Sequence, residues 1–316
     1  MIEVKNLTKR YGQHYAVNDI SFTVDDGEIL GFLGPNGAGK TTTMNIITGY
    51  LSATEGDVII NGVDILAEPE KAKRNIGYLP DNPPLYNEMK VDEYLRFVAD
   101  IKKVKSHERV KMINDIKEMV RISDMSNRMI KNLSKGYKQR VGLAQAMMGY
   151  PEVIIMDEPT VGLDPKQIIE MRDVIKRLGK KHTVILSSHI LQEVSAVSDH
   201  IMIINKGRIK ESGTAEHLSN KLTQGYVMSV RVKGEETRIL NAIESFPVIK
   251  KVTPAGSQEP GTIDLELSGD DNVDIREAIF ACMSKNGFPI LEMKSLNLSL
   301  EEIYLQITGS EGGASQ

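Results

Sequence analysis

The segment that most restricts how this chain can fold is Gly34–Thr42, which reads GPNGAGKTT. It matches the pattern G-x-x-x-x-G-K-[ST], which binds phosphate where a strand enters the loop and a helix leaves it. Both flanking segments have this character, because the preceding EILGFL is apolar and β-rich and the following TTTMNIITGYL is helical in composition. The sequence therefore predicts an α/β fold with a phosphate loop between a strand and a helix.

The residues of this phosphate loop, Gly34–Thr42, have separate roles in binding a nucleotide. Glycines let backbone N–H groups turn inward on a phosphate, and the helix N-terminus adds the positive end of its dipole. We expect Lys40 to reach the β- and γ-phosphates, and the Thr41 hydroxyl to face Mg²⁺. The predicted nucleotide-binding residues of the loop are Gly34, Pro35, Asn36, Gly37, Ala38, Gly39, Lys40, Thr41 and Thr42.

The second chemical feature is the run VIIMDEP, in which Asp157 and Glu158 follow an apolar strand. Ligands of open α/β sheets bind at the carboxyl ends of the strands, where these carboxylates would lie. Asp157 is therefore expected to hold Mg²⁺ through water, and Glu158 to orient or deprotonate an attacking water. An acidic pair after apolar residues also occurs in ordinary surface turns, so this assignment depends on the phosphate loop in the same chain.

Strand patterns dominate the N-terminal part of the chain, with a helical region inserted among them. The runs EVKNL, ISFTV and EILGFLG are β-rich, and Asp26-Gly27 and Asn61-Gly62 are typical hairpin turns. Residues 91–150 are predicted to form a helical subdomain. The later runs EVIIM and HTVILSS are continuously apolar, as in parallel strands that are buried on both faces. A last hairpin, HIMIINKGRIKESG, leads to the end of this domain near Leu218.

Beyond residue 218 the predicted order of elements is strand, helix, strand, strand, helix, strand. The segments are YVMSVRV, EETRILNAIESF, VIKKVTP, TIDLELS, VDIREAIFACMSKNG and PILEMKS. The order β-α-β-β-α-β is that of a ferredoxin-like α+β domain. The predicted domains are therefore residues 1–218, an accessory ferredoxin-like domain at 219–308, and a disordered tail at 309–316.

Composition excludes several functional classes. The formal charge of the 316 residues is -4, so the chain is not a polycation that coats nucleic acid. Its single cysteine, Cys282, cannot form an internal disulfide and suits a reducing cytosol. The chain does not start with a signal-peptide pattern, and apolar runs such as Val153–Met156 are far too short to span a bilayer. We therefore expect a soluble protein whose membrane role, if it has one, depends on a partner.

The base of the nucleotide is indicated by one mismatch and one aromatic residue. A guanine site would need N-K-x-D, but Asn205–Arg208 reads NKGR and is better explained as the turn of the last hairpin. Adenine is often held by stacking, for which Tyr11 is a candidate. A lone tyrosine is more often a core or surface residue, so this assignment depends on the motifs that follow.

The segment Leu133–Arg140, LSKGYKQR, carries the resemblance to a family. It resembles the L-S-G-G-Q signature of ATP-binding cassette ATPases, and from Tyr11 to Gly213 the chain is similar to such a cassette. The resemblance implies that two cassettes pair head to tail, so that each signature segment contacts the γ-phosphate bound by the other chain. Ser134 would donate its hydroxyl, Gly136 its backbone N–H, and the helix from about Lys138 its dipole.

Other positions match or depart from the family pattern one by one. The resemblance implies that Asp164, in VGLDP, lies in the loop that crosses the dimer contact, and that His189, in SSHIL, contacts the γ-phosphate. The signature has Lys135 and Tyr137 where the family favours glycine and glutamine. A further departure is Asp81, which occupies the position of a Mg²⁺-sensing glutamine and would reach the metal only through water.

The resemblance implies a function as well as a fold. The chain would be the ATPase subunit of a membrane transporter, with ATP and Mg²⁺ as cofactors and no nucleic-acid partner. It would pair as a homodimer, or with a different cassette, and sit on the cytoplasmic face of the membrane through separate permease subunits. The extra C-terminal domain is similar to that of bacterial export-type cassettes, which serve drugs, lipids, polysaccharides or sodium, or gliding motility. Import is the alternative, and a role on nucleic acid or the ribosome is disfavoured because the chain has one phosphate loop and no heptad arm.

Overall fold

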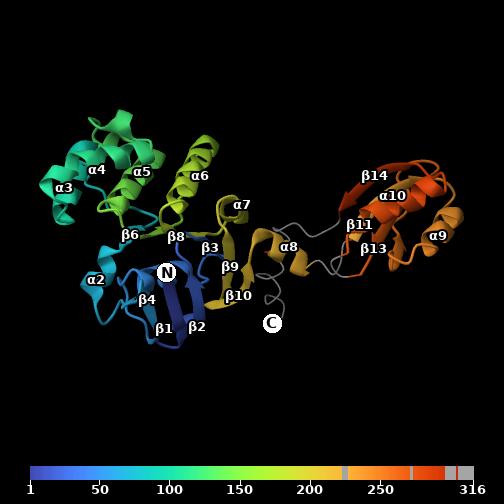
Figure 1. The fold of residues 1–316 in the computed structure, drawn as a ribbon, viewed down its shortest axis with the longest axis horizontal. Helices are drawn as coiled ribbons and strands as arrows, with labels where there is room; N and C mark the ends of the chain where they lie inside the picture. The colour runs from blue at the N-terminus through green and yellow to red at the C-terminus, as the bar shows by residue number, and fades with distance from the viewer. Residues whose placement is uncertain (223–226, 271–272, 296–303, 305–316) are drawn as a thin grey trace. The chain divides into compact units, whose positions relative to one another are not determined.

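The computed structural model describes residues 1–222, 227–270, 273–295 and 304. This part of the chain divides into two compact units, one of residues 1–214 and one that begins at Ala215 (Figure 1). The division precedes helix α8 (Ala215–Leu222), whereas the sequence places the domain boundary inside that helix, after residue 218. No helix in the described ranges is both long and apolar enough to cross a bilayer.

The first unit contains two sheets, as expected for a mixed β-core with antiparallel N-terminal strands. The antiparallel sheet has the order β2-β1-β4-β5 and is formed by β1 (Ile2–Tyr11), β2 (His14–Val24), β4 (Glu55–Ile60) and β5 (Val63–Asp64). The other sheet has the order β10-β9-β3-β8-β7-β6 and is parallel except at its β10 edge. Its strands are β3 (Ile29–Leu33), β6 (Ile76–Leu79), β7 (Val153–Asp157), β8 (Thr183–Ser188), β9 (His200–Asn205) and β10 (Arg208–Gly213).

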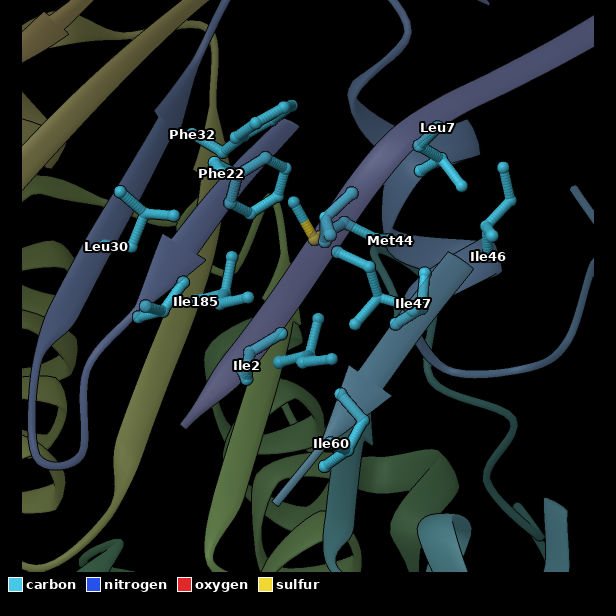
Figure 2. Packing of buried hydrophobic residues seen from close by; sticks show 14 of the residues in the cluster. Ile2, Leu7, Phe22, Leu30, Phe32, Met44, Ile46, Ile47, Ile60 and Ile185 are labelled. Atoms are coloured by element: carbon cyan, nitrogen blue, oxygen red, sulfur yellow. The ribbon is translucent and has the colours of Figure 1, made fainter. Parts of the chain in front are cut away.

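The main core of this unit is shared by both sheets and helix α1 (Lys40–Ile47). Figure 2 shows Ile2 and Ile60 of the antiparallel sheet near Met44 of α1, with Phe22 beside Phe32 of β3. All five residues are buried, and the two phenylalanine rings lie 5.8 Å apart between centroids. Because burying one such side chain contributes about 1.5 to 3 kcal/mol, this core fixes the strand that enters the phosphate loop and the helix that leaves it.

The helical subdomain contains three longer helices and two short 3₁₀ turns. Helix α3 (Val91–Ile101) buries Val91, Tyr94, Leu95 and Val98, which is the spacing of one helical face. Figure 1 shows α3, α4 and α5 together. The remaining helices of the first unit are α2 (Pro69–Arg74), α4 (Ser106–Met119), α5 (Lys135–Met147), α6 (Pro165–Gly179) and α7 (Leu191–Ser195), and the 3₁₀ turns are η1 (Ser123–Met125) and η2 (Ile130–Asn132).

The predicted hairpin turns have different outcomes. Asn61-Gly62 joins β4 to β5, and Lys206-Gly207 joins β9 to β10, each with two positive φ angles, so these two predictions are confirmed. Asp26-Gly27 does form a turn, but the hairpin prediction is wrong because β2 and β3 belong to different sheets. The partners of β3 are β8 and β9, so this turn carries the chain from one sheet to the other.

The second unit confirms the predicted β-α-β-β-α-β order. Its described strands form an antiparallel sheet of order β12-β13-β11-β14, which is the ferredoxin-like arrangement. The elements are β11 (Val227–Lys233), α9 (Glu236–Glu244), β12 (Lys251–Pro254), β13 (Thr262–Ser268), α10 (Arg276–Lys285) and β14 (Ile290–Ser295). Cys282 is buried in the core of this unit. The terminal run LSLEEIYLQIT and the predicted tail at 309–316 lie outside the described residues, except for Tyr304.

Candidate functional site

The phosphate loop connects β3 to α1 and packs closely against its surroundings. Gly39 precedes the helix with a φ of 107°, a conformation that favours glycine. A Cβ at Gly34 would collide with the Ile204 carbonyl oxygen, and one at Gly39 with the Ala16 carbonyl oxygen. The loop backbone therefore approaches its neighbours more closely than larger residues would allow. Asn36, Gly37 and Thr41 are exposed, Pro35 and Thr42 are half-buried, and Ala38 is buried.

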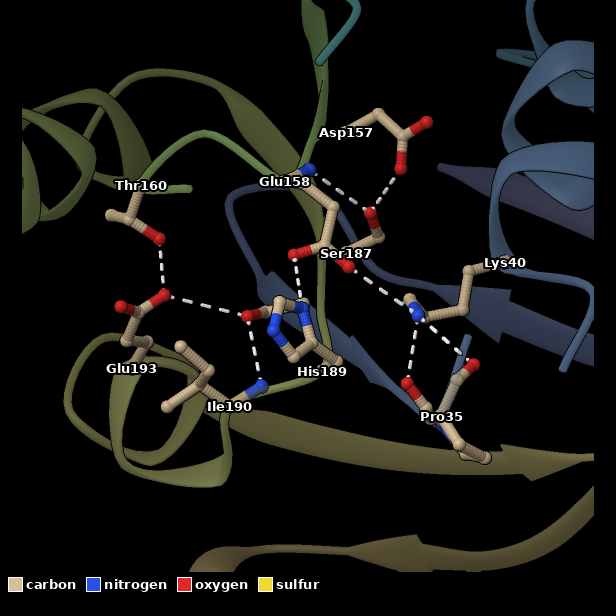
Figure 3. Close-up of polar contacts among 11 residues, drawn as sticks. Pro35, Lys40, Asp157, Glu158, Thr160, Ser187, His189, Ile190 and Glu193 are labelled. Atoms are coloured by element: carbon tan, nitrogen blue, oxygen red, sulfur yellow. Dashed lines mark hydrogen bonds and ion pairs between the residues drawn. The ribbon is translucent and has the colours of Figure 1, made fainter. Parts of the chain in front are cut away.

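Lys40 is buried beneath this loop, with only 6% of its surface exposed. Its Nζ lies 2.7 Å from the Gly34 carbonyl oxygen and 3.2 Å from that of Pro35. The same ammonium lies 3.3 Å from Glu158 Oε1 (Figure 3). The loop thus holds a desolvated cation at the point where a nucleotide phosphate is expected.

Asp157 and Glu158 occupy the carboxyl end of β7, as the sequence predicts, but their side chains differ in direction (Figure 3). Asp157 is buried and accepts a hydrogen bond from the Ser187 hydroxyl. Glu158 adopts a positive φ of 49°, which interrupts the strand geometry. Its backbone N–H donates to Ser187, with 3.2 Å to the hydroxyl oxygen and 3.2 Å to the carbonyl oxygen. The two neighbouring carboxylates can therefore serve different partners.

His189 follows β8 and meets Glu158 from the neighbouring strand. Its Nδ1 lies 2.9 Å from Glu158 Oε2, so one carboxylate contacts Lys40 through one oxygen and His189 through the other. The His189 side chain remains 39% exposed. The structure therefore brings the three predicted catalytic residues, Lys40, Glu158 and His189, into one cluster at the phosphate loop.

The three predicted metal ligands line one cavity of about 920 Å³. Thr41, Asp157 and Asp81 are among its lining residues. Asp81 Oδ1 is buried without a hydrogen-bond partner in the described structure, whereas Oδ2 accepts from Asn82 Nδ2 at 3.2 Å. One hydroxyl and two carboxylates suit Mg²⁺, which is usually bound through one or two carboxylates together with substrate phosphates. The residues present therefore fit the ion that the sequence predicts.

Tyr78 lies in the same cavity and is held in its neutral form. Burial raises the pKa of the Tyr78 phenol far above its usual range, and the carboxylates of Asp157 and Asp81 raise it further. Its hydroxyl donates to Asn45 Oδ1 at 3.2 Å. The phenol therefore adds no charge to the predicted metal site.

Tyr11, the predicted adenine platform, ends β1 and is 51% exposed. Lys9 Nζ lies 5.4 Å from the centroid of its ring. The adjoining strand β2 reaches the phosphate loop, because Ala16 approaches Gly39. The exposed ring is available for stacking, and its role remains a prediction.

The signature segment Leu133–Arg140 begins its helix earlier than the sequence analysis expects. Helix α5 starts at Lys135 rather than at about Lys138, because Ser134 forms the N-cap and its hydroxyl accepts from Tyr137 N at 3.4 Å. Ser134 and Lys135 are exposed, and Gly136 lies in the first turn.

The signature segment contacts the loop that contains Asp164. Asp164 caps α6 by accepting from Gln167 N at 2.9 Å, and Gln167 Nε2 lies 3.5 Å from Ser134 Oγ. The side chain of Lys135 lies close to Gly162 in the same loop. Ser134, Lys135 and Asp164 are therefore adjacent within one chain, as neighbouring parts of one surface.

Sequence reasoning missed the residues that connect these motifs. Ser187 contacts both Asp157 and Glu158, and Gln167 connects the signature segment to the loop containing Asp164. Ser187 is the next-to-last residue of the predicted strand HTVILSS, and a polar residue near the carboxyl end of such a strand is a candidate site residue. Gln167 is an ordinary polar residue of a helical run and gives no such signal.

Comparison with known proteins supports the resemblance to ATP-binding cassette ATPases. The family model described as ABC transporter matches residues 17–161. The uncharacterized ABC transporter ATP-binding protein YhcH of Bacillus subtilis (strain 168) is 33% identical over 98% of this chain and 96% of its own length. The linearmycin resistance ATP-binding protein LnrL of the same organism is 31% identical over 98% of this chain and 98% of its own.

A solved structure extends the likeness to the fold. It is a dimeric ATP-binding cassette, MJ0796, in a post-hydrolysis state bound to ADP and Pi. It matches with a TM-score of 0.62 and 26% identity, and covers 68% of this chain and 98% of its own. Since relatives that match 98% of this chain at 31 to 33% identity are ABC transporter or resistance ATP-binding proteins, and a solved cassette shares the fold of 68% of it, the chain belongs to the ATP-binding proteins of ABC transporters.

Proposed function

We propose that the protein hydrolyses ATP as the motor subunit of an export-type ABC transporter. The observation that carries this proposal is the Glu158 carboxylate, which lies between Lys40 and His189 beside the phosphate loop. A carboxylate in this position can accept a proton from water that attacks the γ-phosphate. Lys40 supplies positive charge to the β- and γ-phosphates, and His189 contacts the γ-phosphate from the other side.

Mg²⁺ would be held by Thr41, Asp157 and Asp81 and would neutralise charge on the phosphates. The remaining tasks belong to the chain itself. The phosphate loop orients the nucleotide through its backbone, and Tyr11 stacks on the base. Glu158 then takes the proton of the attacking water, because its contacts with Lys40 and His189 hold the carboxylate beside the phosphate loop.

Two chains would pair head to tail, each completing the other's site. Ser134 and Lys135 are exposed and lie next to the loop containing Asp164, which suits a surface that meets a second subunit. Ser134 and the Gly136 backbone would contact the partner's nucleotide. The solved cassette that is similar to this chain is a dimer bound to ADP and Pi, which supports the pairing of two cassettes.

The permease would bind the cavity that contains the predicted metal ligands. Part of its wall is formed by the large apolar side chains of Tyr86, Phe97 and Ile101. Tyr86 and Ile101 are exposed large apolar residues, which suits a helical segment of a membrane protein. A permease seated here would place the chain on the cytoplasmic face of the membrane and would sense its nucleotide state. The relationship to a linearmycin resistance protein favours export.

A pair of matched variants tests the permease interaction. Ile101→Asp places a charge in the cavity, whereas Val110→Asp places one at an equally exposed apolar site on α4 that does not line it. We expect Ile101→Asp to retain ATP hydrolysis but to lose copurification with its integral membrane protein, and Val110→Asp to retain both. Copurification that survives in Ile101→Asp would contradict this docking site.

The direction of transport is tested with the membrane protein that copurifies. The complex of this chain with that membrane protein is reconstituted in vesicles with the chain on the outside, so that the outside corresponds to the cytoplasm. An exporter should then move its cargo into the vesicles when ATP is added. Movement in the opposite direction would identify an importer. Transport without ATP hydrolysis would contradict the motor role.

A further inference from the structure

Glu193 is a buried carboxylate that the proposed reaction does not use. It lies on α7 with 5% of its surface exposed. Its Oε2 accepts hydrogen bonds from the Thr160 hydroxyl and, at 3.4 Å, from the Ser188 hydroxyl. Thr160 and Ser188 are buried as well. A buried charge is costly unless it is hydrogen-bonded, so these hydroxyls are held to the carboxylate.

The two hydroxyls belong to the segments at the ends of β7 and β8 that carry the proposed catalytic residues. Thr160 lies between Glu158 and Asp164 in the loop after β7, and Ser188 is the last residue of β8, immediately before His189. The Ser188 hydroxyl also accepts from Ile190 N at 3.1 Å, on the far side of His189. Figure 3 shows Thr160, Glu193 and Ile190 in one continuous chain of contacts. A single carboxylate oxygen therefore joins the loop of Glu158 to the loop of His189.

We propose that Glu193 is a positioning residue that keeps His189 against Glu158 and transmits movement of the Asp164 loop to His189. The inference rests on the proposed function, because it assigns Glu158 and His189 to hydrolysis. Hydrogen bonds to a charged oxygen are about twice as strong as neutral ones, so this link resists separation of the loops. A shift of the Asp164 loop on pairing would pull Thr160, and through Glu193 it would move Ser188 and His189.

Four variants separate the carboxylate from the hydroxyl that it holds. Glu193→Met removes both acceptor oxygens at similar size, and Glu193→Gln retains one. Thr160→Val removes the hydroxyl at the same shape, and Thr160→Ser retains it. Because misplacing a catalytic group by about 1 Å can cost up to about 100-fold, we expect Glu193→Met and Thr160→Val to lower kcat by about 10- to 100-fold. Thr160→Ser should match the parent, and Glu193→Gln should fall between.

The Michaelis constant and the double variant test whether the link acts as one unit. The KM for ATP should stay within about twofold of the parent, because Lys40 and its loop contact neither residue and uniform binding is untouched. Adding Thr160→Val to Glu193→Met should lower kcat little further, since the link is already broken. A double variant whose losses multiply would show that the two residues act separately.

A spectroscopic measurement separates this inference from the proposed function. In the parent, Glu158 accepts from His189 Nδ1, so the ¹⁵N resonance of Nδ1 should be that of a protonated nitrogen. In Glu193→Met the ¹⁵N resonance of His189 Nδ1 should move toward the value of a free histidine, which is averaged over the protonated and unprotonated nitrogen. Absence of ATP hydrolysis in the parent would contradict the proposed function and leave this measurement valid.

Lys117→Met is the matched control for loss of a buried charge. Lys117 is equally buried and contacts two partners, Asp92 Oδ1 at 2.6 Å and Ser126 Oγ at 3.0 Å, in the helical subdomain. Its loss should lower the melting temperature without changing kcat or the His189 resonance. The proposal is overturned if Glu193→Met also lowers only the melting temperature. If Glu193→Met fails to fold, Thr160→Val tests the proposal by itself, through its kcat and the ¹⁵N resonance of His189.

Discussion

The Lys40–Glu158 pair leads to a prediction about ATP affinity as well as catalysis. Glu158→Gln keeps the size of the side chain but removes its charge and its ability to accept a proton. Lys40 would keep its contacts to the carbonyl oxygens of Gly34 and Pro35, at 2.7 and 3.2 Å. We therefore expect the variant to fold normally and to lose hydrolysis by about 10²- to 10⁴-fold, which is the usual effect of losing a general base.

The same variant should bind ATP more tightly. Two unit charges 3.3 Å apart attract each other by about 5 kcal/mol at an effective dielectric constant of about 20. Most of this is offset by desolvation of the pair, and we expect a net effect of about 1 to 2 kcal/mol. In the parent, Lys40 must loosen its contact with Glu158 to reach phosphate, and Glu158 repels that phosphate. Removing the carboxylate relieves both effects, so affinity should rise by about 5- to 30-fold.

Equilibrium titration of the isolated chain with a fluorescent ATP analogue measures this change. Glu88→Gln is the control, because it removes the same charge from an exposed carboxylate that pairs with Lys131 on the surface. We expect its affinity and hydrolysis to equal those of the parent. Unchanged or weaker binding by Glu158→Gln would refute the idea that the Lys40–Glu158 pair opposes the nucleotide. Hydrolysis at the parental rate would show that Glu158 is not the base.

Two further predictions concern the signature segment and the metal site. Ser134→Arg should leave ATP binding by the monomer unchanged and abolish hydrolysis, because a bulky cation blocks the contact between subunits; a folded monomer that cannot bind ATP would show that the segment acts within its own chain. Asp81→Gln should hydrolyse ATP within about tenfold of the parent, while Asp81→Ala should lose more, because only glutamine returns an oxygen to the site. Equal rates in Asp81→Gln, Asp81→Ala and the parent would remove Asp81 from the metal site.

Local chemistry explains what the sequence could predict. The phosphate loop Gly34–Thr42 is contiguous, and its flanking strand and helix are encoded beside it. The turn at Asn205–Arg208 could be assigned from the sequence because a glycine follows the apolar run HIMII, and in the structure both Lys206 and Gly207 adopt positive φ. The alternating pattern of the second unit likewise predicted its six elements in order.

Features that depend on distant residues could not be predicted. The turn at Asp26-Gly27 resembles a hairpin locally, and only the pairing of β3 with β8 and β9 shows that the chain changes sheets. Strand β6 is four residues long and too short to give a periodic signal. In the site, the hydrogen bond from Ser187 to Asp157 joins two strands that are adjacent only after folding. Helix α5 starts earlier than predicted because Ser134 is both its N-cap and part of the signature.

The positive φ of Glu158 places a backbone cost at the proposed catalytic position. Glutamate is poorly suited to a left-handed backbone, at a cost of about 1 to 2 kcal/mol, whereas glycine and asparagine adopt it readily. Glycine or asparagine at position 158 would relieve this backbone cost, but either replacement would delete the proposed base and leave buried Lys40 without the carboxylate that lies 3.3 Å from its Nζ. Any thermostable form engineered from this protein must gain its stability elsewhere and keep this unfavourable residue.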